Sequence, residues 1–97
     1  MTTPADLERI THKLNQAYAM MAFSESATLL VAVRFLLGQI RSDDMPTQAT
    51  RTQWMHIEET MLRLGSGAVA SDEIRGLGLE IRHLRGSIVQ YLSRISY

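Results

Sequence analysis

The sequence lacks residue types whose absence narrows what the protein can be. It has no cysteine, so disulfide bonds and thiol chemistry are excluded, and this fits a reducing compartment such as the cytoplasm. Its only lysine is Lys13, and arginine therefore supplies nearly all of the positive charge. Arginine suits partly buried ion pairs and protein interfaces better than lysine does. These absences lead us to expect a cytoplasmic protein.

An excess of charge of either sign is also missing, and so is a long apolar run. The formal net charge is zero, so no overall field attracts nucleic acid or anionic lipid. The first residues, Met1 to Asp6, carry neither the basic head nor the apolar centre of a signal peptide. The most apolar stretch, residues 17–40, is interrupted by Ser24-Glu25-Ser26 and by Arg34. Because a membrane span needs about 20 predominantly apolar residues, we expect none.

The most regular pattern present is in the last segment of the chain. Its large apolar residues follow one another by alternating steps of three and four, the spacing of a helix packed along one seam. They are Ile74, Leu77, Ile81, Leu84, Ile88, Tyr91 and Ile95. We favour a seam that packs inside the chain's own core. A parallel two-stranded coiled coil, with Glu80 and Arg85 at the flanking positions, remains the alternative.

Three further segments carry apolar residues at helical spacing. Thr3 and Asp6 predict a capping box at the start of the first helix, with Pro4 as its first residue. Ser24-Glu25-Ser26 disturbs the pattern and predicts a break or kink, and Gly65-Ser66-Gly67 predicts the end of the third helix. Ser71 is expected to cap the last helix. The predicted helices cover residues 4–23, 26–41, 46–64 and 72–96.

The pattern as a whole predicts an all-α fold. We expect residues 1–97 to form a single domain, a small antiparallel bundle of three to four helices. A chain of this size buries only about 60–70% of the surface of its unfolded state. Because its core is thin, self-association would add stability, and we expect the bundle to be dimeric.

The segment from Ala27 to Arg41 is apolar on two sides. One stripe consists of Leu30, Val33, Leu37 and Ile40, whereas Val31 and Phe35 lie on nearly the opposite side. A helix that is apolar on both sides must be covered on both. We expect a second subunit or another protein to cover the side of Val31 and Phe35. The alternative is a four-helix core that covers both sides within one chain.

Residues with catalytic or metal-binding chemistry are present but do not form a recognisable site. His56 and Glu59 stand in the reverse order of the Glu-x-x-His motif of di-iron bundles, and only once. Glu8 and His12 are one helical turn apart without further ligands, and the remaining histidine, His83, has basic neighbours. No strand-turn-helix elbow or glycine-rich anion loop accompanies the serines and threonines. We therefore expect neither an enzyme nor a cofactor or metal.

A helical interaction protein is the function class that the sequence favours. Methionine and aromatic side chains give adaptable apolar surface, and we expect the protein interface to include Met20, Phe23, Val31 and Phe35. The expected role is a small regulator or adaptor that forms a homodimer and acts by binding another protein. An inhibitor or anti-activator of a transcription factor is one such role. The alternative is a DNA- or RNA-binding regulator that uses Arg75, Arg82 and Arg85.

Overall fold

The protein is an all-α bundle, as the sequence predicts. The computed structural model describes residues 3–23, 27–64 and 71–95, apart from the side chains of residues 22, 23, 27–30 and 71. Over these ranges it contains four α-helices, one short 3-10 helix and no strand. The α-helices are α1 (Pro4–Phe23), α2 (Ala27–Leu37), α3 (Gln48–Leu64) and α4 (Ser71–Ile95), and the 3-10 helix is η1 (Ser42–Asp44).

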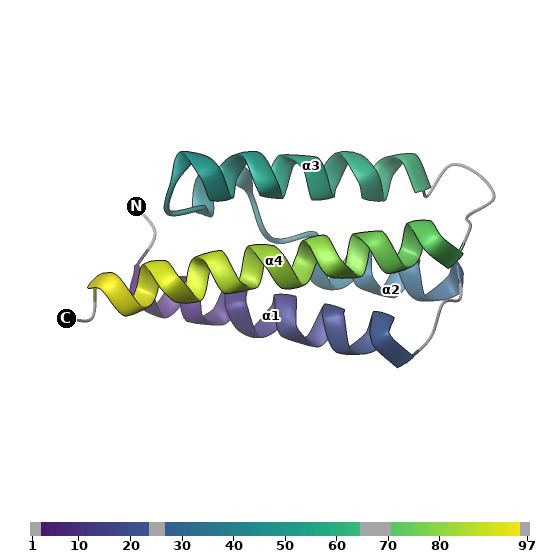
Figure 1. Ribbon diagram of the computed structural model, residues 1–97, viewed down its shortest axis with the longest axis horizontal. Helices are drawn as coiled ribbons and strands as arrows, with labels where there is room; N and C mark the ends of the chain where they lie inside the picture. Colours follow the sequence, from purple (N-terminus) through teal and green to yellow (C-terminus); the bar gives the residue numbers. More distant parts are fainter. Residues whose placement is uncertain (1–2, 24–26, 65–70, 96–97) are drawn as a thin grey trace.

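Consecutive α-helices run in opposite directions along the bundle (Figure 1). Helix α4 packs most extensively against α1 and also packs against α3, whereas α2 packs mainly against α1. Helix α2 has 11 residues and is much shorter than α4, which has 25. The start of α1 and the end of α4 lie at the same end of the bundle (Figure 1). Helix α4 is therefore the element that joins α1 to α3.

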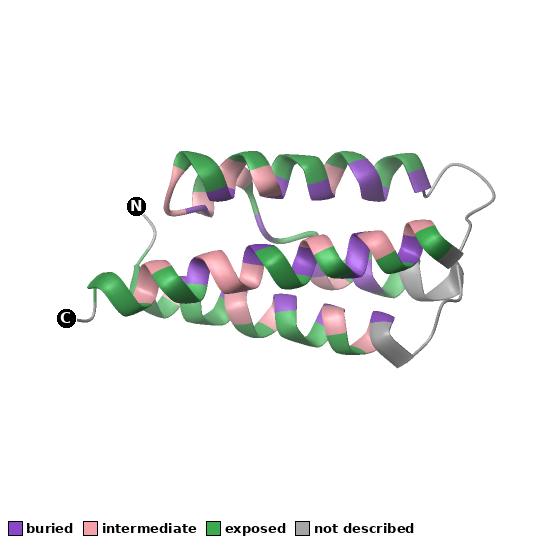
Figure 2. Ribbon diagram, viewed as in Figure 1, coloured by how far each residue is buried: buried purple, intermediate pink, exposed green. Residues whose placement is uncertain are grey.

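The core is formed by the apolar faces that the spacing predicts, and they point toward one another across the bundle (Figure 2). Five residues of the α4 seam are between 0% and 1% exposed: Ile74, Leu77, Ile81, Leu84 and Ile88. On the other helices the buried residues are Leu7, Ile10, Leu14, Ala17 and Met21, then Val33 and Leu37, then Trp54, Ile57, Met61 and Leu64. Burying one large apolar side chain stabilises the fold by about 1.5–3 kcal/mol.

The α4 seam is thus intrachain core, and the alternative of a parallel coiled coil along this seam is wrong. Its side chains from Ile74 to Ile88 are already covered by α1 and α3, so they have no surface left for a second copy. The seam leaves the core near the end of the helix, where Tyr91 is half-buried and Ile95 is 46% exposed.

The start of α1 has the predicted capping box. The Asp6 N–H donates to Thr3 Oγ1 at 3.2 Å, and the Thr3 N–H donates to Asp6 Oδ2 at 3.2 Å. The two bonds satisfy backbone donors that have no partner within the helix. The Thr3 backbone N–H and then its hydroxyl, helped by the Arg9 guanidinium 2.7 Å away, hold the pKa of the Asp6 carboxyl below its ordinary value.

Helix α2 ends earlier than predicted, at Leu37 rather than at residue 41. The Gly38 N–H bonds to the Phe35 carbonyl at 3.4 Å and the Ile40 N–H to the Leu37 carbonyl at 3.0 Å, so tight turns replace the helical ladder. Glycine is a weak helix former, which favours an end at this point. Ile40 is nevertheless buried, because the turn returns its side chain to the core. The apolar stripe therefore extends beyond the helix.

Helix α3 begins at Gln48, two residues later than predicted, and is capped by Thr47. Thr47 Oγ1 accepts a hydrogen bond from the Thr50 N–H, and Thr50 Oγ1 accepts one from the Thr47 N–H, both at 3.1 Å. Asp44 instead accepts from the Arg41 N–H at 3.0 Å and closes η1. Two threonines thus form a reciprocal cap of the kind usually made with glutamate.

Three local predictions lie outside the described residues. They concern the break at Ser24-Glu25-Ser26, the helix end at Gly65-Ser66-Gly67 and the capping side chain of Ser71.

Candidate protein-binding face

Helix α2 contacts the bundle with one side and leaves large apolar side chains on the other. Val33 is 0% exposed and Leu37 is 1% exposed, and both anchor the helix in the core. On the opposite side Val31 is 69% exposed and Phe35 is 89% exposed. The chain itself therefore covers only one of the two apolar sides that the sequence predicts for this segment.

Helix α3 carries a second exposed apolar stripe. Met55 is 56% exposed and Leu62 is 63% exposed, and the steps of three and four from Met55 through Glu58 to Leu62 place all three on one side of the helix. This side is distinct from the buried side that contains Trp54 and Ile57. Both α2 and α3 therefore present a pair of exposed apolar side chains next to one charged residue.

A groove separates these two stripes. Buried side chains form its floor, and polar, glycine or exposed residues form its two walls, with α2 and the turn after it on one side and α3 on the other. The floor consists of Leu37, Ile40, Trp54 and Met61, and the walls consist of Arg34, Gly38, Glu58 and Leu62. We call the surface made by Val31, Arg34, Phe35, Gly38, Met55, Glu58 and Leu62 the α2–α3 face.

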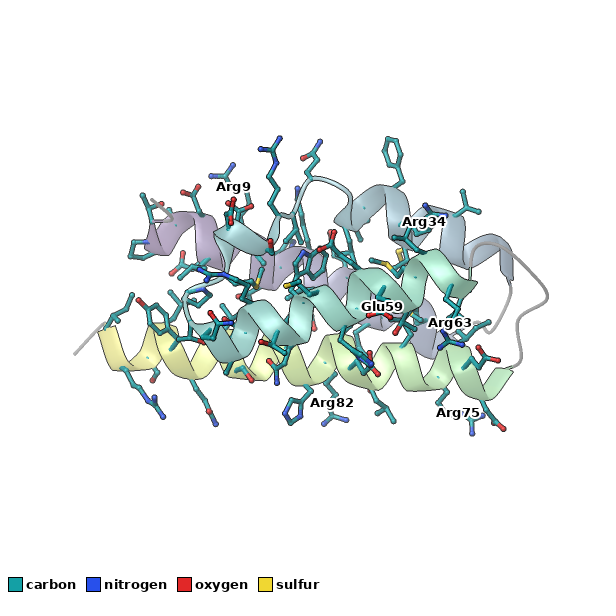
Figure 3. The ribbon with its side chains drawn as sticks, turned by 90° about the horizontal axis from the view of Figure 1, so that it is seen from above. Arg9, Arg34, Glu59, Arg63, Arg75 and Arg82 are labelled. Carbon is teal, nitrogen blue, oxygen red and sulfur yellow. The ribbon has the colours of Figure 1, made fainter. Side chains whose placement is uncertain are left out.

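Charges of opposite sign stand on the two walls of the groove. Arg34 extends from α2 beside α3, as Figure 3 shows, and Glu58 belongs to the opposite wall. Within the described part of the chain, neither side chain makes a hydrogen bond or an ion pair. Each therefore offers its full charge to a molecule bound over the groove.

Of the four residues predicted to form a protein interface, two lie together on this face. They are Val31 and Phe35. Met20 packs against the core and is half-buried, and the side chain of Phe23 is not among those described. Met55 and Leu62, which are also exposed, were not among the predicted residues, although the spacing of Met55, Glu58 and Leu62 indicates a second side of this helix.

The arginines of the alternative nucleic-acid site lie on a different surface, the outer side of α4. A shallow hollow there is lined by Leu79, Arg82, His83, Arg85, Gly86, Ser87 and Gln90. Arg75 lies outside this hollow, nearer the start of the helix, and is exposed. In Figure 3, Arg75 and Arg82 extend from the edge of the molecule opposite to α2. The structure thus brings Arg82 and Arg85 together but leaves Arg75 apart.

One histidine, His56, forms a polar contact between helices. His56 Nδ1 lies 3.1 Å from Glu80 Oε2, which links α3 to α4 across a small hollow also lined by Gln53 and His83. The partner of His56 is therefore Glu80 on α4, and not Glu59, which lies one turn away on the same helix as His56. Within residues 3–23, 27–64 and 71–95, no group of three or more histidine, aspartate or glutamate side chains is placed to hold a metal ion.

Comparison with other proteins adds no relative. No family model matches the chain, and neither a curated protein nor a solved structure matches it. None of the helices in the described ranges is long and apolar enough to cross a membrane. The chemistry of the α2–α3 face must therefore be argued from its own residues.

Proposed function

We propose that the protein is a helical, non-enzymatic regulator or adaptor that acts by binding another protein through the α2–α3 face. The observation that carries this proposal is the 89% exposure of Phe35 on α2, the helix that also forms one wall of a groove with an apolar floor. An inhibitor that covers the contact surface of a larger protein, such as an anti-activator of a transcription factor, is the role that we favour.

The composition of the face supports the proposal. A large apolar side chain left in water forgoes about 1.5–3 kcal/mol of burial, and this surface holds Val31, Phe35, Met55 and Leu62. Scattered exposed apolar residues are ordinary, but apolar pairs that flank a groove with an apolar floor resemble the apolar patches, rimmed by polar groups, of interaction sites. Here Arg34 and Glu58 supply the polar groups that fix the orientation of a bound partner.

The experiment is affinity capture from an extract of the host cell with three immobilised proteins. They are the unmodified chain, Phe35→Glu and Leu79→Glu. Leu79 is 54% exposed on α4 and serves as the matched control, since its change adds the same charge at another exposed apolar position. We expect a protein that the unmodified chain and Leu79→Glu retain and that Phe35→Glu loses. Retention of every bound protein by Phe35→Glu would refute the proposal.

Nucleic-acid binding is the second candidate, supported by the hollow that Arg82, His83 and Arg85 line on α4. We rank it lower because the formal net charge is zero and Arg82 already interacts with Tyr18. The first proposal leads us to expect no salt-sensitive binding to random duplex DNA or to RNA at physiological ionic strength. A complex that weakens steeply with added salt and is lost on Arg82→Ala would reverse this ranking.

A further inference from the structure

From the pattern of the α2–α3 face, we infer that the isolated protein forms a dimer in which this face of one copy binds the same face of the other copy. This inference rests on the proposed function and deepens it by naming one partner, its orientation and its contacts. The dimer that it describes is isologous, which means that each copy contributes the same surface.

The two halves of the face are opposite in charge, and each carries two exposed apolar side chains. On α2, Val31 and Phe35 stand beside a positive charge, that of Arg34. On α3, Met55 and Leu62 stand on either side of a negative charge, that of Glu58. When α2 of one copy lies on α3 of the other, apolar side chains therefore contact apolar side chains, and arginine faces glutamate.

A twofold axis along the groove produces this pairing twice. Helices α2 and α3 run in opposite directions and border one groove, so rotation about its length lays α2 of one copy over α3 of the other (Figure 1). Because Arg34 and Glu58 line opposite walls of one groove, the rotation brings the Arg34 wall of each copy onto the Glu58 wall of the other. Both charges thereby gain the partner that they lack within the described part of the chain.

The charged walls of the groove, which Arg34 and Glu58 line, set the relative orientation of the two copies. The opposite orientation, with α2 over α2, would instead bring the two arginines together and is disfavoured by their like charge.

The experiment measures molar mass by light scattering and sedimentation over a range of concentrations. We expect the unmodified chain and the control Leu79→Glu to dimerise, and Phe35→Glu to remain a monomer with unchanged helical circular dichroism. Phe35 is 89% exposed in the single chain, so its replacement leaves the core intact. The single reversals Arg34→Glu and Glu58→Arg should each raise the dimer dissociation constant at least about tenfold, because each places like charges opposite one another.

The decisive part of the experiment combines the two charge-reversal variants. When Arg34→Glu and Glu58→Arg are mixed in equal amounts, both cross-copy pairs become opposite in charge, and we expect a heterodimer. The chain that carries both reversals should dimerise with itself again. A dimer mediated by another surface would show neither recovery.

Three results would overturn the inference. They are a monomer at every accessible concentration, a dimer that Phe35→Glu leaves intact, and reversals that do not compensate one another. These failures are distinct from failure of the proposed function. A monomeric chain that still captures a protein in a Phe35-dependent way would refute only the second copy as occupant.

Discussion

The guanidinium carbon of Arg82 lies 5.7 Å from the centroid of the Tyr18 ring, so a cation on α4 rests on an aromatic face of α1. Tyr18 is half-buried against the core, which fixes the ring. The Arg82 guanidinium is thereby held against Tyr18 of the same chain. An anion that binds the outer side of α4 through Arg82 would have to compete with this contact.

A double-mutant cycle measures this contact. We expect Arg82→Ala and Tyr18→Leu to show a coupling free energy of about 0.5–1 kcal/mol, the range for a cation over an aromatic ring at an exposed site. Urea unfolding of the two single variants and the double variant gives the value. Arg94→Ala on the same helix, combined with Tyr18→Leu, is the control and should show no coupling.

The core position Leu84 is predicted to be among the most sensitive. Its side chain is 0% exposed between α1 and α3, so Leu84→Ala should lower the free energy of unfolding by about 2–5 kcal/mol. Leu79→Ala, five residues earlier and 54% exposed, should change it by less than about 0.5 kcal/mol. Equal effects of the two changes in urea titrations would contradict the packing described for α4.

Glycine positions in the helices give a prediction of opposite sign. A methyl group at Gly86 would meet no atom within 4 Å, so Gly86→Ala should stabilise the protein by about 1 kcal/mol through helix propensity alone. A methyl group at Gly38 would lie 3.0 Å from the Arg34 carbonyl oxygen, and Gly38→Ala should give no such gain. Thermal unfolding separates the two, since about 1 kcal/mol shifts the Tm of such a domain by roughly 4–8 °C.

The capping box predicts a pH dependence. Because the pKa of Asp6 is lower in the folded chain than its ordinary value of 3.8, its charge stabilises the fold above that value. This contribution is lost as the pH falls through the folded pKa. Asp6→Asn should therefore be less stable than the unmodified chain at neutral pH, and the difference should vanish in acid. A difference in urea midpoint that is the same at both pH values would contradict this origin.

The core faces could be predicted because periodicity alone fixes which side of a helix is apolar. Leu14, Trp54 and Ile81 each lie in an unbroken run of three- and four-residue steps, and each is buried. The ends of α2 and α3 were less predictable. Ile40 continues the apolar stripe although it follows the helix, and Thr50 takes the place in the cap with Thr47 that glutamate usually has.

The candidate site could be predicted only in part. The exposure of Phe35 follows from its place opposite Val33, which the sequence shows. The groove does not follow, because it depends on where the bundle places α2 relative to α3 and on the turn that returns Ile40 to the core. That Arg34 and Glu58 line one groove likewise becomes visible only in the folded chain.

The packing of α4 against both α1 and α3 also constrains how the protein is made. A ribosome delivers α1, α2 and α3 before it delivers the helix that covers them. Until the segment through Ile88 has left the exit tunnel, Leu14 and Trp54 lack their main neighbours. Domains fold as units during synthesis, so the nascent chain must carry uncovered apolar faces until α4 has emerged. It is in this interval that chaperones would have access to it.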